Sequence, residues 1–393
     1  MKAVYKEALE LHEENKGKIA VSLKIECNNA KDLSLAYSPG VAQPCLEIEK
    51  DKSLSYTYTN RANTIAVISD GTAVLGLGDI GPEAAMPVME GKALLFKRFG
   101  EVDAFPLVVD TKDPEEIIKF CKQIAPSLGG INLEDISAPR CVEIERRLIE
   151  ELNIPVFHDD QHGTAIVVLA GLINSMKLTG KKPEECKVVV NGTGSAGSSI
   201  MKMLYNYGFT NIIAFDSKGC LHPKNEARYD FLKKELLTIV NKEKKDYVSL
   251  AEALIGADVF LGISVANVVT KNMVKTMAEK PVIMAMANPN PEITYEDAKE
   301  AGAYIVGTGR SDYPNQINNL LAFPYIFRGV LDAKGTKITD DIKIATSVAI
   351  ASLVSDDELS SDCIIPSPFD ERLLDVVSSA VKEACIKSGF VRA

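Results

Sequence analysis

The chain has 393 residues, which is more than one hydrophobic core usually supports, so we expect two domains. Hydrophobic residues make up 46% and charged residues 25% of the chain, an ordinary composition for a globular protein. The formal net charge of -10, with no visible basic stripe, argues against binding to a nucleic-acid backbone.

The cysteines and the apolar segments bear on location. Eight cysteines are scattered without C-x-x-C spacing, so we expect neither a zinc site nor a disulfide framework. The N-terminus is charged and helix-like, and no apolar run in the sequence is long enough to span a membrane. These features predict a cytoplasmic location and no membrane partner.

In the first part of the chain, short strands alternate with helices. Helical periodicity covers residues 1–20, and turn signals between residues 33 and 54 then interrupt it. Further elements are predicted as strands at 64–69, 72–77, 104–109 and 154–157 and as helices at 89–99, 117–128 and 138–152. We assign residues 1–157 to a smaller N-terminal α/β domain.

The pattern changes after an apolar helix predicted at residues 163–178. Strands are predicted at 187–191, 211–215, 259–263, 282–287 and 304–307, and helices at 198–207, 341–353 and 370–387. Alternation at this spacing predicts a doubly wound parallel sheet, Rossmann-like, in a domain of residues 158–393. The C-terminal helices either close this domain or pack back onto the first one.

A dinucleotide-binding fingerprint, G-x-G-x-x-G, follows the strand at 187–191. Its residues are Gly192, Thr193, Gly194, Ser195, Ala196 and Gly197. The glycines permit a tight turn, close approach of a pyrophosphate and close packing of strand on helix, and the helix N-terminus favours the anion. A glycine-rich turn that binds no ligand is the alternative.

The residues after the next strand bear on which nicotinamide cofactor binds. Asp216 closes that strand, where an acid normally binds the ribose hydroxyls of the adenosine half. Its charge disfavours the 2′-phosphate of NADP, but Ser217 and Lys218 could accommodate one. NAD is therefore favoured, and NADP stays open.

Two acidic clusters stand ahead of the fingerprint. Glu134 and Asp135 form the first, and Asp159 and Asp160 the second. Carboxylates between apolar, strand-like segments are costly to bury unless a cation neutralises them, and oxygen donors suit Mg²⁺ or Mn²⁺. A hard metal beside a nicotinamide cofactor indicates oxidation of a hydroxy acid that chelates the metal. Alternatively the acids lie in surface turns or cap helices, for example one that starts near Gly163.

Two further residues have ordinary structural explanations. Lys92 has apolar neighbours on both sides, which predicts partial burial, a lowered pKa and suitability as a general base. An exposed structural lysine is the alternative. Tyr37 lies near a turn and could equally be a core tyrosine. The local pattern alone singles out neither residue.

Several sequence blocks, in one order, resemble the short, prokaryote-type malic enzymes from about residue 5 to 385. The blocks are YSPGVA (37–42), LGLGDIGP (75–82), VMEGK (88–92), GINLED (130–135), VFHDDQHGTA (156–165), ANP (287–289) and GRSDYPNQINN (309–319). So many blocks in one order are hard to obtain by chance.

The resemblance implies roles for individual residues. In that family the lysine matching Lys92 is the general base and the tyrosine matching Tyr37 the general acid. The acids matching Glu134, Asp135 and Asp160 bind the metal. The N-terminal domain is accordingly expected to bind substrate and metal.

Other positions follow from the same resemblance. Asn288 is expected at the cofactor and the substrate, and Asn318 and Asn319 at the substrate. Asp159 is expected to orient Lys92 or a metal ligand. The larger eukaryotic relatives carry a substrate-binding arginine where this chain has Val74, so the holder of the second substrate carboxylate stays open, with nearby asparagine amides as candidates.

The expected reaction is metal-dependent oxidative decarboxylation of L-malate to pyruvate and CO₂ with reduction of NAD(P)⁺; decarboxylation of oxaloacetate stays open. One alternative is a metal-independent NAD(P) dehydrogenase of another hydroxy or amino acid. Another is a nucleotide-binding relative without catalysis. By resemblance a homo-oligomer, dimer or tetramer, is expected, and the segment that carries Tyr37 could swap between subunits.

Overall fold

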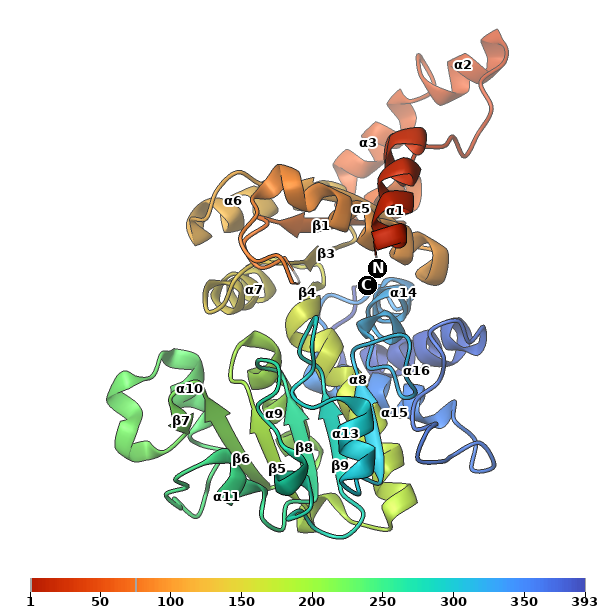
Figure 1. Ribbon diagram of the computed structural model, residues 1–393. Helices are drawn as coiled ribbons and strands as arrows, with labels where there is room; N and C mark the ends of the chain where they lie inside the picture. The colour runs from red at the N-terminus through yellow and green to blue at the C-terminus, as the bar shows by residue number, and fades with distance from the viewer. Residues whose placement is uncertain (1, 75, 393) are drawn as a thin grey trace.

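The computed structural model describes residues 2–74 and 76–392. The strands of this part of the chain form two sheets, which lie one above the other in Figure 1. The N-terminal sheet has the strand order β2-β1-β3-β4, and the C-terminal sheet the order β10-β9-β8-β5-β6-β7. The predicted α/β fold, with a doubly wound C-terminal sheet and a smaller N-terminal one, is confirmed.

The N-terminal sheet is parallel and covered by helices on both faces. Its strands are β1 (Thr64–Ser69), β2 (Asp103–Val108), β3 (Gly130–Leu133) and β4 (Val156–His158). Its helices are α5 (Pro82–Gly100), α6 (Pro114–Ile124) and α7 (Arg140–Glu151). Alternate residues of β1 belong to two different apolar clusters, one shared with α5 and one with α6 and α7. Every residue of β1 is therefore buried.

The C-terminal sheet is parallel except for its short edge strand β7. Its strands are β5 (Lys187–Asn191), β6 (Asn211–Asp216), β7 (Gly219–Cys220), β8 (Val259–Gly262), β9 (Val282–Ala285) and β10 (Ile305–Thr308). From β5 the chain continues to β6 on one side and later returns to β8 on the other. Ligands of such sheets bind at this switch point, beyond the carboxyl ends of the strands.

The helices of the C-terminal half surround this sheet. They are α8 (Asp159–Thr179), α9 (Ser195–Tyr207), α10 (Phe231–Leu236), α11 (Leu250–Leu254), α12 (Lys271–Val274), α13 (Tyr295–Glu300), α14 (Phe323–Asp332), α15 (Asp340–Ser352) and α16 (Arg372–Ser388). The C-terminal helices do both things left open by the sequence, because α15 packs on α8 while α14 packs on α5.

Aromatic side chains join the two halves into one core. The ring of Phe96 on α5 lies edge-on to Phe323, with centroids 4.7 Å apart, and to Phe327, at 5.3 Å. Phe327 also packs edge-on against Phe157 of β4 at 6.1 Å. A single apolar cluster therefore runs from the N-terminal sheet through α14 to the C-terminal sheet.

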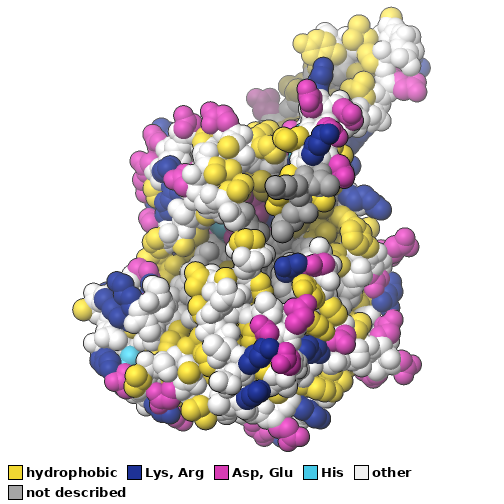
Figure 2. Space-filling view, in the orientation of Figure 1, with side chains coloured by type: hydrophobic (Ala, Val, Ile, Leu, Met, Phe, Trp, Pro, Cys, Tyr) yellow, Lys and Arg dark blue, Asp and Glu magenta, His cyan; other side chains and the backbone are white. Residues whose placement is uncertain are grey.

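The N-terminal helices form an arm that extends away from both sheets (Figure 1). The arm comprises α1 (Lys2–Asn15), α2 (Ala30–Ala36) and α3 (Ala42–Lys50), and α4 (Ser55–Tyr58) follows it. The region predicted to hold turns thus contains two helices. Hydrophobic side chains are exposed along the arm, as Figure 2 shows, among them Val21, Leu23, Ile25, Leu33 and Leu35.

Residues 72–77 do not form the predicted strand. Gly76 and Gly78 have φ angles of +75° and +78°, which side chains with a Cβ rarely adopt. The N–H of Val74 donates to the carbonyl of Gly78 at 3.0 Å, so the backbone closes a tight turn. Leu75, the first residue of the LGLGDIGP block, lies outside the described residues.

The helix predicted to start near Gly163 begins at Asp159, directly after β4. Its N-cap residue is His158, whose side chain makes no capping hydrogen bond. Asp159 and Asp160 lie in the first turn, where a helix dipole favours negative charge, so the capping alternative is wrong. The strand β3 was not predicted because it is only four residues long and starts with glycine.

Two bulk properties can be read from the structure. All eight cysteines are free, and most of them are buried. Within residues 2–74 and 76–392, no helix combines the length and the apolar character needed to cross a membrane.

We expect Phe327→Ala to lower the free energy of unfolding by about 3–5 kcal/mol, because a fully buried ring would leave a cavity where the two halves meet. Urea unfolding measures this loss. Phe369→Ala is the control, since that side chain is 76% exposed. Equal destabilisation by both substitutions would contradict a packing role for Phe327.

Candidate active site

Carboxylates gather at the carboxyl ends of β3 and β4. Glu134 and Asp135 follow β3, and Asp160 lies in the first turn of α8 after β4. The two strands are parallel neighbours with Leu133 opposite His158, so these side chains meet at one edge of the sheet. One oxygen from each of Glu134, Asp135 and Asp160 lies within 4.8 Å of the other two.

The backbone is shaped to hold this cluster. Asp135 has a φ of +53°, a conformation that is uncommon for a residue other than glycine. Its N–H donates to Oδ2 of Asp160 at 2.8 Å, and its carbonyl accepts from the N–H of Ala73 at 2.9 Å. These two hydrogen bonds hold the strained backbone in place and so keep the side chain of Asp135 at the cluster. Strained backbone of this kind is often found at functional sites.

The electrostatics of the cluster favour a bound cation. Burial, followed by repulsion from Asp160 and Glu134, raises the pKa of Asp135 to about 8. Burial likewise raises the pKa of Asp160 to about 6. Three hard oxygen donors that resist ionisation together are the donor set that suits Mg²⁺ or Mn²⁺, so these residues fit a divalent metal.

Lys92 of α5 is buried beside the cluster, with 8% of its side chain exposed. Its Nζ lies 2.6 Å from Oδ2 of Asp159 and 2.9 Å from Oε1 of Glu134, and 4.1 Å above the ring of Phe323. Burial alone would lower the pKa of Lys92, but Asp159 and Glu134 outweigh it and raise this pKa. The lowered pKa expected from the sequence is therefore wrong for this arrangement.

Asp159 is completely buried and serves as the partner of Lys92. The side-chain amide of Asn319 donates to the same carboxylate oxygen, Oδ2. Gly163, one turn further along α8, leaves room for Asp159, since a Cβ there would lie 2.0 Å from Oδ1. Asn319, expected at the substrate, is thus engaged with Asp159.

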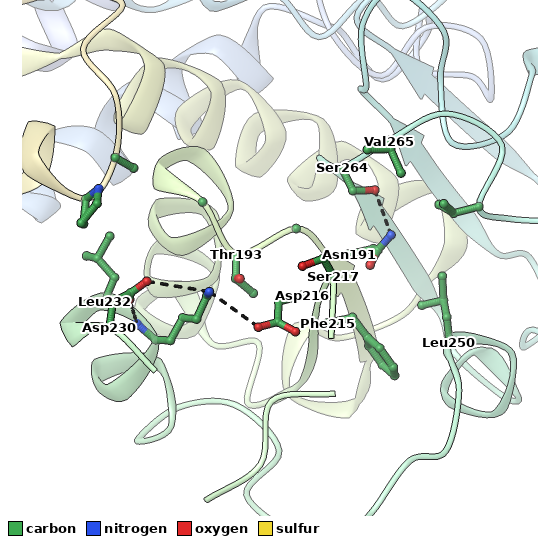
Figure 3. A pocket seen from close by; sticks show the side chains of 16 residues that line it. Asn191, Thr193, Phe215, Asp216, Ser217, Asp230, Leu232, Leu250, Ser264 and Val265 are labelled. Carbon is green, nitrogen blue, oxygen red and sulfur yellow. Dashed lines mark hydrogen bonds and ion pairs between the residues drawn. The ribbon is translucent and has the colours of Figure 1, made fainter. Parts of the chain in front are cut away.

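A cavity of about 730 Å³ opens at the switch point of the C-terminal sheet (Figure 3). Gly192, Thr193 and Gly194 line it between β5 and α9, and Asp216 lines it at the end of β6. A Cβ at Gly194 would point into open space, whereas one at Gly197 would lie 2.1 Å from the carbonyl oxygen of Gly192. The cradle therefore has room for a dinucleotide pyrophosphate.

Cations surround Asp216, the acid expected at the ribose. Its Oδ1 accepts from the N–H of Lys218 at 2.8 Å. The Nζ of Lys233 lies 3.6 Å from Oδ2, and a guanidinium nitrogen of Arg228 lies 3.8 Å from Oδ1. In Figure 3 the ion pairs of Asp216 and Asp230 meet at one lysine, which is Lys233.

A second cavity, of about 430 Å³, connects the carboxylates with the dinucleotide turn. Its lining includes Asp135, Asp160, Ser195, Ala196, Asn288, Asn318 and Asn319. Two of the three predicted metal ligands, the three predicted asparagines and the start of α9 therefore line one cavity.

Tyr37, the predicted general acid, lines neither of these two cavities. It lies at the C-terminal end of α2, on the arm, and its side chain is 68% exposed. Val74 is buried and contributes only an apolar side chain, so the asparagines remain the candidates for the second carboxylate of a substrate.

Three positioning contacts were not predicted from the sequence. Asn132 donates to Oε2 of Glu134 at 2.9 Å, and its place two residues before that acid in GINLED was the available signal. Arg140 pairs with Asp70 at 2.7 Å and so ties the loop after β1 to the loop after Asp135. Glu292 accepts from the N–H of Ala287 at 3.1 Å beside Asn288; nothing in its local pattern marks it.

The fold and these sites define an oxidoreductase that binds a nicotinamide dinucleotide beside an oxygen-donor metal centre. Two family profiles match the chain: Malic enzyme, N-terminal domain, over residues 14–149, and Malic enzyme, NAD binding domain, over residues 161–387. The chain belongs to the malic enzyme family, as the sequence blocks predicted.

Individual relatives agree over almost the whole chain. The chain is 56% identical to the bifunctional malic/malolactic enzyme of Bacillus subtilis (strain 168), over 98% of this chain and 94% of that protein. It is 53% identical to the NAD-dependent malic enzyme of Geobacillus stearothermophilus, over 96% and 78%. The crystal structure of malic enzyme from Pyrococcus horikoshii Ot3 superposes with a TM-score of 0.95 at 46% identity, over 99% and 92%. Other relatives are NADP-dependent malic enzymes.

We expect Gly194→Ala and Gly197→Ala to fail in different ways. Gly194→Ala meets no atom of the protein, so the melting temperature should hold while dinucleotide affinity falls, because the methyl group occupies the pyrophosphate space. Gly197→Ala should lower the melting temperature itself, since its Cβ collides with backbone. Calorimetric titration with NAD⁺ and thermal unfolding separate the two. Equal melting temperatures for both variants would contradict this assignment.

Proposed function

We propose that this chain catalyses oxidative decarboxylation of L-malate to pyruvate and CO₂ with reduction of NAD⁺ or NADP⁺. One observation carries the proposal: Asp135 and Asp160 share a cavity with Ser195 and Ala196 of the dinucleotide turn, and Glu134, the third carboxylate of the cluster, pairs with Lys92. A hydroxy acid in that cavity reaches a base, a metal and a hydride acceptor at once.

Each residue has a task in this mechanism. Glu134, Asp135 and Asp160 would hold a divalent cation, which supplies a Lewis acid for the hydroxyl and carboxylate oxygens of malate. Lys92 Nζ takes the C2 hydroxyl proton as hydride leaves C2, returns it to that oxygen as CO₂ leaves, and takes it again when C3 is protonated. A proton from Tyr37 reaches C3 after CO₂ has left. Engagement of Glu134 with a cation would weaken the effect of one of the three carboxylates, Asp159, Glu134 and Asp160, that favour the ammonium form of Lys92.

Asp159 and the asparagines complete this assignment. Asp159 holds the ammonium end of Lys92 at 2.6 Å and is fixed in turn by Asn319. Asn288 and Asn318 line the cavity between the carboxylates and the dinucleotide turn, where their amides would bind the second carboxylate of malate and the nicotinamide half of the cofactor.

The surroundings of Asp216 support use of both cofactors. Its carboxylate suits the ribose hydroxyls of NAD, while Lys233, Arg228 and Ser217 offer charge and hydrogen bonds to a 2′-phosphate. We favour NAD as the preferred cofactor, because the 2′-phosphate would have to lie beside Asp216.

We further infer a domain boundary between residues 157 and 158. The end of β4 and the start of α8 lie at His158 and Asp159, and the two matched profiles end and begin at residues 149 and 161. The eight free cysteines support the inference of a cytoplasmic location.

The reaction itself is tested by incubating the protein with L-malate, with NAD⁺ or NADP⁺, and with or without Mn²⁺. We expect Mn²⁺-dependent formation of reduced cofactor and an equal amount of pyruvate. Reduced cofactor without pyruvate would point to a plain dehydrogenase, and no reduction under any condition would refute the proposed function.

Lys92→Ala should lower kcat by about 10²–10⁴-fold, the usual contribution of a general base, while affinity for NAD⁺ stays close to wild type. The matched control is Lys97→Ala, whose lysine lies on the same helix with 62% of its side chain exposed. Steady-state kinetics and NAD⁺ titration provide both readouts. Malate oxidation near the wild-type rate in Lys92→Ala would refute the assignment of the base.

We also propose that Tyr37 acts in the active site of a second copy of this chain. Its side chain is exposed at the end of α2, beside exposed Leu33 and Leu35, and Figure 1 shows α2 at the tip of the arm, away from α5, which carries Lys92. Burial of those apolar side chains against a second copy would stabilise a homodimer.

Subunit mixing tests this assembly. Tyr37→Phe and Lys92→Ala should each be inactive alone, yet co-expressed they should regain about one quarter of wild-type activity. Half of randomly assembled dimers are mixed, and each mixed dimer has one of two sites intact. No regained activity, although native mass spectrometry shows mixed dimers, would place both residues in one chain's site.

A further inference from the structure

Glu145 is a buried acid that the proposed reaction does not use. It lies on α7 in the N-terminal half, with 3% of the residue exposed. Its Oε1 accepts the backbone N–H of His158 at 2.8 Å, and its Oε2 accepts from Gln161 Nε2 at 3.2 Å and from His162 Nε2 at 2.9 Å. Within residues 2–74 and 76–392, no lysine or arginine forms an ion pair with it.

These donors belong to the start of α8, whose first N–H groups have no partners within the helix. The side chain of the N-cap residue His158 does not cap the helix; Glu145 accepts the backbone N–H of His158 and binds the side chains of Gln161 and His162. Asp159 and Asp160 lie between His158 and Gln161. Glu145 therefore fixes the turn that carries one expected metal ligand and the partner of Lys92.

His162 continues this contact into the cofactor half. With Nε2–H donating to Glu145, its Nδ1 is the acceptor, an assignment that follows from the partners. Ser199 Oγ lies 3.0 Å from Nδ1, and Lys343 Nζ lies 3.4 Å from it. Ser199 lies on α9, the helix that begins in the dinucleotide turn at Ser195.

We propose that Glu145 is a positioning residue which, through His162 and Ser199, couples divalent-metal binding to dinucleotide binding. The contact chain joins the metal-binding turn of α8 to the helix at the pyrophosphate. Ordering either end orders the other, so each ligand strengthens binding of the other. This inference rests on the proposed function for the location of both ligands.

Mn²⁺ binding tests the coupling without turnover. Free Mn²⁺ is measured by electron paramagnetic resonance during titration of the full chain, with and without saturating NAD⁺. For the wild type we expect a Kd for Mn²⁺ that falls about 5-fold or more when NAD⁺ is bound.

Two variants and a control separate the links. Glu145→Gln should weaken Mn²⁺ binding by about 10–100-fold, because its amide offers one acceptor oxygen where three donors converge. Ser199→Ala should bind Mn²⁺ like the wild type without NAD⁺ and lose the gain with NAD⁺. Glu143→Gln, an exposed acid on the same helix, should match the wild type.

An unchanged Kd in Glu145→Gln, a full NAD⁺ effect in Ser199→Ala, or no NAD⁺ effect in the wild type would overturn the proposal. If Glu145→Gln lacks a folded thermal transition, Ser199→Ala decides alone. Glu134→Gln in the same titration distinguishes failure of the proposed metal site from failure of the proposed coupling. Wild-type Mn²⁺ affinity in that variant would refute the proposed metal site, whereas weakened affinity there with intact coupling in Ser199→Ala would refute only this inference.

Discussion

Four buried or half-buried carboxylates surround the ammonium group of one lysine in this protein, and much of the nearby structure compensates the excess negative charge. Glu134, Asp135, Asp159 and Asp160 converge at the ends of β3 and β4, and Lys92 is the ammonium among them. Excess negative charge at low exposure is tolerable only where donors, protons or a cation compensate it. Asn132, Asn319 and the N–H of Asp135 each donate to one of these carboxylates.

Lys92 and Asn319 come to the cluster from distant parts of the chain, which ties the two sheets together. Lys92 reaches the cluster from α5, while Phe323 at the start of α14 places its ring over the ammonium. Asn319 lies just ahead of the same helix. The aromatic contacts of Phe96 and Phe327 hold α5 and α14 in register, so the packing of the core and the geometry of the site are one arrangement.

Local sequence pattern predicted many of the strands and helices of this fold, but it misplaced some turns and helix starts. The bounds of β1 and β5 follow from short, β-branched runs, because a buried parallel strand leaves that mark on any sequence. Residues 72–77 resemble such a run, yet Gly76 and Gly78 turn the backbone. The start of α8 was placed too late because acids in a first helical turn look like a cap from sequence alone.

The site shows the same division. The resemblance to malic enzymes grouped Glu134, Asp135 and Asp160 correctly, and the structure explains their proximity, since they follow the carboxyl ends of two adjacent parallel strands. The expected pKa of Lys92 was wrong because its apolar neighbours in sequence predict burial, whereas its charge partners come from β3 and α8. The position of Tyr37 on an exposed arm could not be read either, since nothing near it in sequence fixes where a protruding segment lies.

Cofactor choice depends on a similar long-range sum of charges. Asp216 alone would repel a 2′-phosphate, which is the inference that a fingerprint and one acid allow. Lys233 and Arg228 reach that carboxylate from the segment around α10 and offset its charge, although Lys233 also pairs with Asp230. The 2′-phosphate of NADP, placed beside Asp216, would thus lie next to Lys233 and Arg228, whose positive charges Asp216 already partly neutralises. Asp216, Lys233 and Arg228 together, rather than the acid alone, form the charged surroundings that a ribose hydroxyl or a 2′-phosphate would meet at the end of β6.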